Sequence, residues 1–325
     1  MEPAAGALRL SSMWRFDEHG LLRRQGVLAS GVSIRELDAA IRAKTLVRVE
    51  RGVYIDAETL KGEPRYRQKQ IAYRARCLAV ATRHDGDRVL SHESAAAVHG
   101  LPMLDPDRRY VHVINGKGSG GHSKKRLAVV HAGRIPPAEI VTIDGVRVTS
   151  LARAAADLAR KVDFARGLAV LDAAMRLGVE RAELEELLAA RRAGVGAARY
   201  ALRHADPRAA NPGESWSRAQ IIAAGFPVPE LQVEHVLADG SSAFVDFDWE
   251  GKVVGEFDGV VKYGRDYLEL GQAPADVVVA EKLREDALRD LGLGVVRWVY
   301  KSLRTNAMLD RVRTRLRARG IWVPD

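Results

Sequence analysis

The chain has 325 residues and a formal net charge of +9, which suggests two or three domains and a polyanionic partner, nucleic acid first, although a merely solvated basic surface is the alternative. Its single cysteine, Cys77, excludes an internal disulfide and favours a reducing compartment. No stretch approaches eighteen uninterrupted apolar residues and no signal pattern opens the chain, so a cytoplasmic protein without a membrane span is expected.

Residues 1–58 are predicted to form a winged helix-turn-helix domain. A helix is expected over 17–28, Ser33 is expected to cap a second helix with apolar residues at helical spacing, and two short alternating strands follow over 46–56. Helix, turn, helix and β-ribbon is the order of a winged helix, whose second helix enters a major groove while the ribbon lies on the backbone.

The basic residues of this domain are the predicted contacts to DNA. Arg35 lies near the start of the second helix and is the best placed for a base edge, whereas ribbon residues would hold phosphates. The full set is Arg35, Arg42, Lys44, Arg48 and Arg51. The alternative is a small winged domain used for protein contacts, with solvated arginines.

Residues 59–150 are expected to form a basic α/β region. Helices are predicted over 62–83 and 91–100, and strands at 110–114 and 127–131 flank a loop rich in glycine and lysine. The loop lacks the spacing of a nucleotide-binding loop, so it either touches a DNA backbone or is a solvated hairpin tip. The first alternative assigns four residues to DNA: Lys117, Lys124, Lys125 and Arg126.

Two histidines in this region, His92 and His99, are candidates for a zinc site. His92-Glu93 begins like the motif of zinc proteases, but Ala96 stands where the second histidine would be required. His92 and His99 are too far apart to share a helical turn, so the sequence argues against zinc here.

Residues 151–210 are predicted to be a helical connector without visible chemistry, and residues 211–325 a compact mixed α/β domain. The elements expected in the second segment are a helix from Glu214, a three-strand meander, a helix over 276–291 with an apolar stripe, a strand over 295–300 and one last helix over 301–319.

Carboxylates alternate along the hairpin of that meander. Asp246 and Asp248 share one face of their strand, and Glu256 and Asp258 share a face of the next. Carboxylates brought together would raise one another's pKa, and Mg²⁺ or Mn²⁺ would relieve the repulsion. The alternative is a sheet face that meets water with its acids outward.

Residues 211–302 resemble the restriction-endonuclease-like (PD-(D/E)XK) superfamily, in the branch similar to very-short-patch repair endonucleases. The resemblance rests on an acid on a helix, Val-Asp-Phe, Gly-Glu-Phe-Asp-Gly, Arg-Glu-Asp-Ala-Leu-Arg-Asp-Leu-Gly and Val-Val-Arg-Trp. It implies an endonuclease-like fold.

The resemblance also assigns roles to individual residues. It implies that Asp246 and Glu256 bind the metal and that Glu214 is the helical acid, and Asp258 is expected as a third metal ligand beside them. Asp258 stands where that superfamily has a lysine, and Lys262 is the first substitute for the lysine role, with Lys282 the second.

Residues 17 to about 160 resemble AbiEi-type antitoxins of bacterial toxin–antitoxin systems. The matching stretches are Gly-Leu-Leu-Arg-Arg-Gln-Gly-Val-Leu-Ala-Ser-Gly, Val-Arg-Val-Glu-Arg-Gly-Val-Tyr and Leu-Ser-His-Glu-Ser-Ala-Ala. The resemblance implies a winged helix that binds operator DNA and represses its own operon. A toxin and a second copy of the chain are the protein partners it allows.

Three functions follow for this multidomain α+β chain. The first is a metal-dependent DNA endonuclease that hydrolyses phosphodiester bonds, with the winged and basic parts supplying affinity for double-stranded DNA. The second is an antitoxin-type transcriptional regulator whose nuclease-like domain is inert. The third, an interaction module without a DNA role, fits the basic charge least well.

Overall fold

The computed structural model describes residues 14–83, 88–116, 123–125, 128–259 and 274–324. These residues form a mixed α+β, multidomain structure with three sheets, as expected. Unit 1 comprises residues 1–100 and 107–150, and unit 2 comprises residues 101–106 and 151–325. No helix in the described part of the chain combines the length and the apolar character that crossing a bilayer requires.

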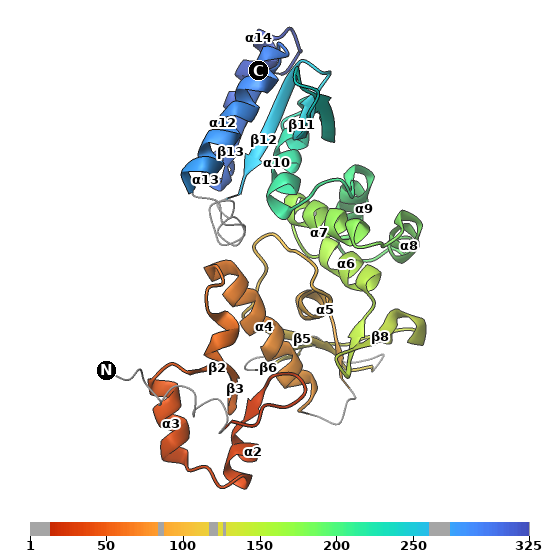
Figure 1. The fold of residues 1–325 in the computed structure, drawn as a ribbon. Coiled ribbons are helices and arrows are strands. Elements are labelled where there is room, and N and C mark those ends of the chain that lie inside the picture. The colour runs from red at the N-terminus through yellow and green to blue at the C-terminus, as the bar shows by residue number, and fades with distance from the viewer. Residues whose placement is uncertain (1–13, 84–87, 117–122, 126–127, 260–273, 325) are drawn as a thin grey trace, which may run out of the picture. The chain divides into compact units, whose positions relative to one another are not determined.

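Unit 1 begins with two short helices and a β-hairpin (Figure 1). The elements are β1 (Leu22–Arg23), α2 (Arg24–Ala29), α3 (Ile34–Arg42), β2 (Leu46–Glu50) and β3 (Val53–Asp56), with strand order β1-β3-β2. Ser33 caps α3 as predicted: its hydroxyl accepts from the backbone N–H of Glu36, whose carboxylate accepts from the backbone N–H of Ser33 at 2.8 Å.

The helix predicted over 17–28 is wrong in its first half. One carboxylate oxygen of Asp17 accepts hydrogen bonds from the backbone N–H groups of His19 and Leu21, both at 2.9 Å, and this holds a turn. Leu22 then pairs with Tyr54 of the hairpin as a strand. A local side-chain hydrogen bond and a distant strand partner therefore replace the first helical turns.

The second part of unit 1 is a six-stranded mixed sheet of order β6-β7-β5-β4-β9-β8. Its strands are β4 (Val89–Leu90), β5 (Val111–Ile114), β6 (Ser123–Lys125), β7 (Ala128–His131), β8 (Ile140–Ile143) and β9 (Val146–Thr149). The accompanying helical elements are η1 (Ala57–Leu60), α4 (Arg65–Ala81), α5 (His92–His99) and η2 (Pro137–Glu139). The predicted loop before residue 127 was wrong over β6, because these residues pair antiparallel with β7.

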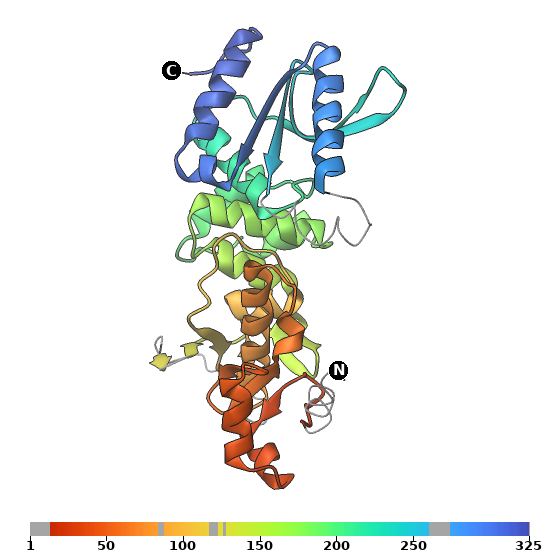
Figure 2. The ribbon, with the colours of Figure 1, turned by 60° about the vertical axis from the view of Figure 1, so that its left-hand side comes forward.

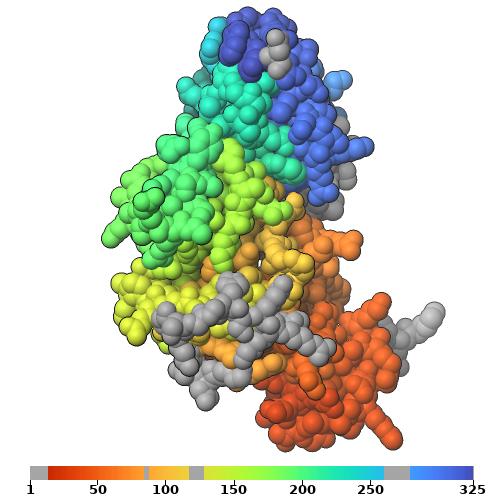
Figure 3. Space-filling view, turned by 180° about the vertical axis from the view of Figure 1, so that it is seen from behind, coloured from red at the N-terminus to blue at the C-terminus, as the bar shows by residue number. Residues whose placement is uncertain are grey.

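Unit 2 begins with four helices, α6 (Leu151–Ala159), α7 (Phe164–Arg176), α8 (Arg181–Leu187) and α9 (Val195–His204), followed by α10 (Pro212–Ala223). Many core positions of these helices are alanine, which allows close packing. The chain also passes closely at Gly194, where a Cβ would lie 1.8 Å from the carbonyl oxygen of Arg160. A buried ion pair links α7 to α10, where Arg218 donates to both oxygens of Asp172 at 2.7 and 2.8 Å. Figure 3 shows these helices, in green, beside the teal start of the following segment.

The rest of unit 2 is a four-stranded sheet between helices (Figure 2). Its elements are β10 (Glu230–Val236), β11 (Ser242–Trp249), β12 (Val253–Asp258), α12 (Pro274–Asp290), β13 (Gly294–Val299), α13 (Tyr300–Arg304) and α14 (Ala307–Ala318). β10, β11 and β12 are antiparallel neighbours, and β13 pairs parallel to β12 as the edge strand. Core residues of α14, including Met308 and Val312, cluster with Phe247 and Trp298 of the sheet, whereas Leu288 of α12 clusters with Val254.

Two predictions about the helices of this domain were wrong. The last helix is interrupted at Asn306, whose φ of 57° is left-handed, so α13 and α14 replace one continuous helix. The expected apolar stripe of Leu283, Ala287, Leu288 and Leu291 does not form on and beside α12. Leu283 and Leu291 are 64% and 40% exposed, and only Leu288 of the four is buried.

Candidate functional site

Asp246 and Glu256 lie next to the paired part of the β11–β12 hairpin. The pairs Phe247–Gly255 and Asp248–Val254 fix the register, and Asp246 and Glu256 come directly beyond the last pair on their strands. The negative charge of Asp246 contributes to the raised pKa of Glu256, so the two carboxylates interact. The backbone N–H of Phe257 donates to Asp246 Oδ2 at 2.8 Å. The side chain of Asp246 therefore binds the backbone of β12 where the pairing of the two strands ends.

The helical acid, Glu214, reaches the same site from the first turn of α10. Its Oε2 accepts from the backbone N–H of Ala210 at 2.7 Å, and its Oε1 accepts from Asn211 Nδ2 at 2.5 Å. Gln232 Nε2 bridges Glu214 Oε2 and Asp246 Oδ1 at 3.3 and 3.2 Å. Burial, followed by the negative charge of Asp246, raises the pKa of Glu214 to about 7.

Arg297, on edge strand β13, is the centre of an ion-pair network. It donates to the two oxygens of Asp258 at 2.7 and 3.0 Å, and it pairs with Glu281 on α12. Its guanidinium also lies 3.6 Å from Glu256 and 3.5 Å from Glu285. Hydrogen bonding to Asp258 raises the pKa of Arg297 above its usual range.

Arg284 of α12 brings a second guanidinium to Glu256. Its Nη2 lies 3.0 Å from Glu256 Oε1, yet this buried oxygen accepts no hydrogen bond from any residue that the structure describes. Burial, together with the charges of Asp246 and Glu281, raises the pKa of Glu256, and the two arginines offset only part of this rise. Glu256 is therefore incompletely satisfied.

The donor set fits a hard divalent cation. Carboxylate oxygens of Glu256, Asp258 and Glu281 lie within 4.8 Å of one another, and oxygen ligands suit Mg²⁺ or Mn²⁺. Two guanidinium groups already supply the positive charge that a cation would bring. The predicted ligands Glu256 and Asp258 thus lie in one carboxylate cluster with Glu281, which Arg284 and Arg297 partly neutralise, and Asp246 is not a member of that cluster.

The three residues considered for the lysine role differ in their surroundings. Asp258 is bound by Arg297, Lys262 lies outside the described residues, and Lys282 is exposed on α12. Asp248, the fourth carboxylate of the hairpin, is engaged elsewhere: its Oδ2 lies 2.7 Å from His235 Nε2, and its Oδ1 accepts from the backbone N–H of Gly251.

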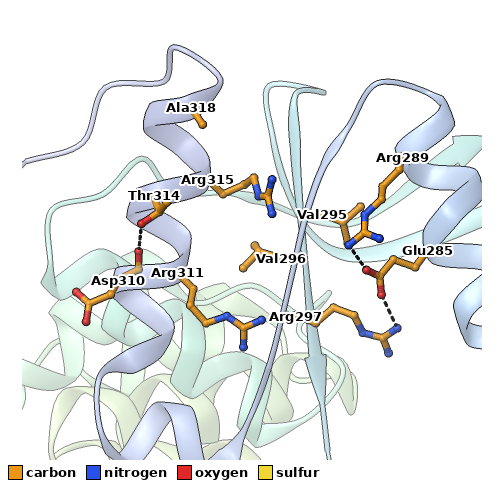
Figure 4. Close-up of a pocket in the computed structure, with 10 residues that line it drawn as sticks. All are labelled: Glu285, Arg289, Val295, Val296, Arg297, Asp310, Arg311, Thr314, Arg315 and Ala318. Carbon is orange, nitrogen blue, oxygen red and sulfur yellow. Dashed lines mark hydrogen bonds and ion pairs between the residues drawn. The ribbon is translucent and has the colours of Figure 1, made fainter.

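A groove of about 580 Å³ follows edge strand β13 between α12 and α14. Arg311 and Arg315 extend from α14 toward β13, and Arg297 extends toward α12 (Figure 4). The groove therefore carries positive charge next to the carboxylates. The sequence prediction gave no role to Gln232, Glu281, Arg284 or Arg297. The available signals were polar residues inside apolar strands, for Gln232 and Arg297, and the place of Arg284 and Arg297 in the stretches that carry the endonuclease resemblance.

The predicted DNA contacts of the N-terminal segment are all exposed. Arg35 lies in the first turn of α3, Arg42 and Lys44 at its end, and Arg48 and Arg51 in the hairpin. Of the second predicted set, Lys117 and Arg126 lie outside the described residues. The backbones of Lys124 and Lys125 belong to β6.

Comparisons with known proteins give the chain a family. Residues 88–204 match the AbiEi antitoxin C-terminal domain, which confirms the resemblance to antitoxins over that part. A crystal structure of the RV2827C protein from Mycobacterium tuberculosis is similar at 16% identity with a TM-score of 0.31, covering 68% of this chain and 85% of that chain.

Two full-length relatives carry the assignment. They are the uncharacterized proteins MT2308 and Rv2248 of two Mycobacterium tuberculosis strains, each 30% identical over 283 residues, which is 83% of this chain and 91% of each relative. The chain therefore belongs to the family of these two mycobacterial proteins and carries at its centre a segment similar to the AbiEi antitoxin C-terminal domain.

Proposed function

We propose that this protein is a DNA-binding transcriptional regulator of antitoxin type. The observation that carries the proposal is the match of residues 88–204 to the AbiEi antitoxin C-terminal domain. The net charge of +9 supports it, because a basic excess attracts the phosphate backbone of nucleic acid.

The N-terminal segment is the proposed reader of DNA, as a winged helix-turn-helix. The capping box at Ser33 holds the N-terminal end of α3, and Arg35 extends from the same turn into solvent. The hairpin presents Arg48 and Arg51, both exposed, as proposed contacts to backbone phosphates. The carboxylate of Glu36 accepts hydrogen bonds from the backbone N–H and the hydroxyl of Ser33, which hold it at the helix cap. Its negative charge therefore cannot move freely toward a bound phosphate.

The test is binding of the full chain to the DNA upstream of its own coding region, followed by fluorescence anisotropy across a salt series. We expect log affinity to fall linearly with log salt, and each lost phosphate contact to reduce the slope by about 0.9. Arg48→Ala should reduce the slope, and Arg35→Ala should cost about 1–3 kcal/mol if it reads a base edge. Arg192→Ala, exposed in unit 2, is the matched control.

Two outcomes contradict the proposal. One is no binding at low salt, and the other is equal binding by the Arg35, Arg48 and Arg192 variants. The antitoxin likeness also makes a cognate toxin and a second copy of this chain proposed partners. Light scattering of the purified chain, alone and after co-expression with its neighbouring gene product, measures both.

A metal-dependent DNA endonuclease is the second candidate function. It is favoured by the convergent carboxylates and by the buried Glu256 Oε1 that accepts no hydrogen bond from the described residues. Asp246, Glu256 and Asp258 would hold Mg²⁺ or Mn²⁺, which when bound polarises a phosphate and activates water. Glu214, with its pKa near neutrality, is the residue of the site best suited to exchange a proton.

Incubation with supercoiled, linear and mismatched DNA, in Mg²⁺, Mn²⁺ or EDTA, separates the two functions. Metal-dependent cutting that disappears in Asp246→Ala and Glu256→Ala supports the endonuclease. Promoter binding without cutting supports the regulator alone, and cutting that survives both substitutions removes these carboxylates from the chemistry.

A further inference from the structure

Three imidazoles gather in the sheet of unit 1, whereas the carboxylate site belongs to unit 2. They are His92 at the start of α5, His112 on β5 and His131 at the end of β7. One ring nitrogen from each lies within 4.8 Å of the others, and His112 Nδ1 lies 2.9 Å from His131 Nε2. His92 and His131 are buried, whereas His112 is partly accessible.

The topology explains why residues so far apart in the sequence meet. β5 and β7 are parallel neighbours in which His112 pairs with Val129 and Ile114 pairs with His131. The two histidines are therefore two positions apart on the same face of the sheet. The backbone N–H of Ser91 donates to the carbonyl oxygen of His112 at 3.0 Å, which fixes the start of α5 against β5 and delivers His92 to the cluster.

The surroundings orient two of the rings. His112 Nε2 lies 3.5 Å from Glu93 Oε2, so its Nδ1 is the nitrogen directed to the cluster. His92 Nδ1 lies 3.0 Å from Ser91 Oγ, and an imidazole held in this way binds a metal through Nε2. A carboxylate or hydroxyl on the second ring nitrogen is the usual support of a metal-binding histidine.

We propose that His92, His112 and His131 form a binding site for a transition metal of the Zn²⁺ class, with Glu93 orienting His112. Imidazole nitrogen is a ligand that Zn²⁺ prefers, and three of them leave a fourth position for water. Nitrogens at about 2.1 Å from a tetrahedral zinc lie about 3.4 Å apart. One separation here is 2.9 Å and all lie within 4.8 Å, which is compatible with that value after a small adjustment.

The rings are also close enough to interact without a metal. The centroids of His92 and His131 are 4.1 Å apart with the rings stacked, and small ring rotations would turn this stack into a coordinating arrangement. The competing arrangement is a hydrogen-bonded histidine stack that binds no ion. Metal binding to the purified protein separates the two.

The experiment uses the full chain after dialysis against EDTA. Zn²⁺ is titrated in competition with a chromogenic chelator, and Co²⁺ is added separately to record its visible absorption. We expect one equivalent of tight Zn²⁺ and the intense bands of tetrahedral Co²⁺. Because the Co²⁺ spectrum is recorded on the unchanged protein, the result does not depend on whether a variant folds.

Variants then assign the ligands, with circular dichroism as the check on folding. Glu93→Gln should weaken Zn²⁺ binding about 10–100-fold, as loss of an orienting partner does, and His112→Asn should weaken it by more than about 100-fold. His204→Gln, in unit 2, is the matched control and should leave binding unchanged. Absence of the Co²⁺ bands, or Zn²⁺ binding that persists in His112→Asn, would overturn the proposal.

Discussion

Glu214 should make the stability of unit 2 decrease as the pH rises. The pKa of this carboxyl is about 7 in the folded chain because of burial and the charge of Asp246, whereas its ordinary value is 4.5. Between these two pH values the folded state binds more protons than the unfolded state. The free energy of unfolding contributed by this group is therefore full below about pH 4.5 and is lost as the pH rises toward 7.

The size of the effect follows from the same two values. At about 1.4 kcal/mol for each unit of pKa, the difference between 4.5 and 7 corresponds to about 3 kcal/mol. Glu214→Gln removes this titration. It also places an amide against the donors Ala210 N–H and Asn211 Nδ2, which adds a cost that does not vary with pH.

Urea unfolding of the full chain between pH 4.5 and 8.5, followed by tryptophan fluorescence, measures the effect. Four of the five tryptophans lie in unit 2 and only Trp14 lies in unit 1, so the signal reports mainly the relevant unit. The free energy of the variant relative to the wild type should rise by about 3 kcal/mol across this range. A difference that stays constant with pH would refute the reasoning, and exposed Glu230→Gln controls for removal of one charge.

Three further substitutions or probes test the packing. Arg218→Ala should cost about 3–5 kcal/mol in urea unfolding, because it leaves the buried carboxylate of Asp172 without its partner, and a loss below about 1 kcal/mol would contradict this. Gly255→Ala should cost about 1–3 kcal/mol, because the added Cβ would lie 2.6 Å from the Trp298 ring; the cost should shrink in a Trp298→Phe background. Burial raises the pKa of Cys77 to about 12, so a thiol reagent at pH 8 should label the native chain only at the rate of unfolding, and rapid labelling would show the thiol to be accessible.

Features that depend on neighbouring residues were predictable from the sequence. The cap at Ser33 and the turn after Glu50 each involve residues within a few positions of one another, and both occur as expected. The helix over 17–28 failed because Leu22 pairs with Tyr54, a partner that local spacing does not reveal. Leu283 and Leu291 fit a helical stripe equally well on an exposed face.

The candidate sites also combine features that neighbouring residues determine with features that distant residues determine. Alternation along one strand was sufficient to place Glu256 and Asp258 on the same face, where both belong to one carboxylate cluster. Arg297 entered from a strand about forty residues later, through a parallel pairing that no local pattern encodes. The histidine cluster was not predictable from local spacing, because His92 lies beside His112 and His131, which come from two strands and not from its own helix.

The pair formed by Asp258 and Arg297 has a consequence for how this family can evolve. The two side chains share two hydrogen bonds, and a lysine at position 258 would instead place like charges in contact. Placing a lysine at position 258 would therefore require a second change at position 297. A substitution at position 258 or at position 297 alone is unfavourable, because the effect of each depends on the other residue. Relatives should therefore differ at both positions together or at neither.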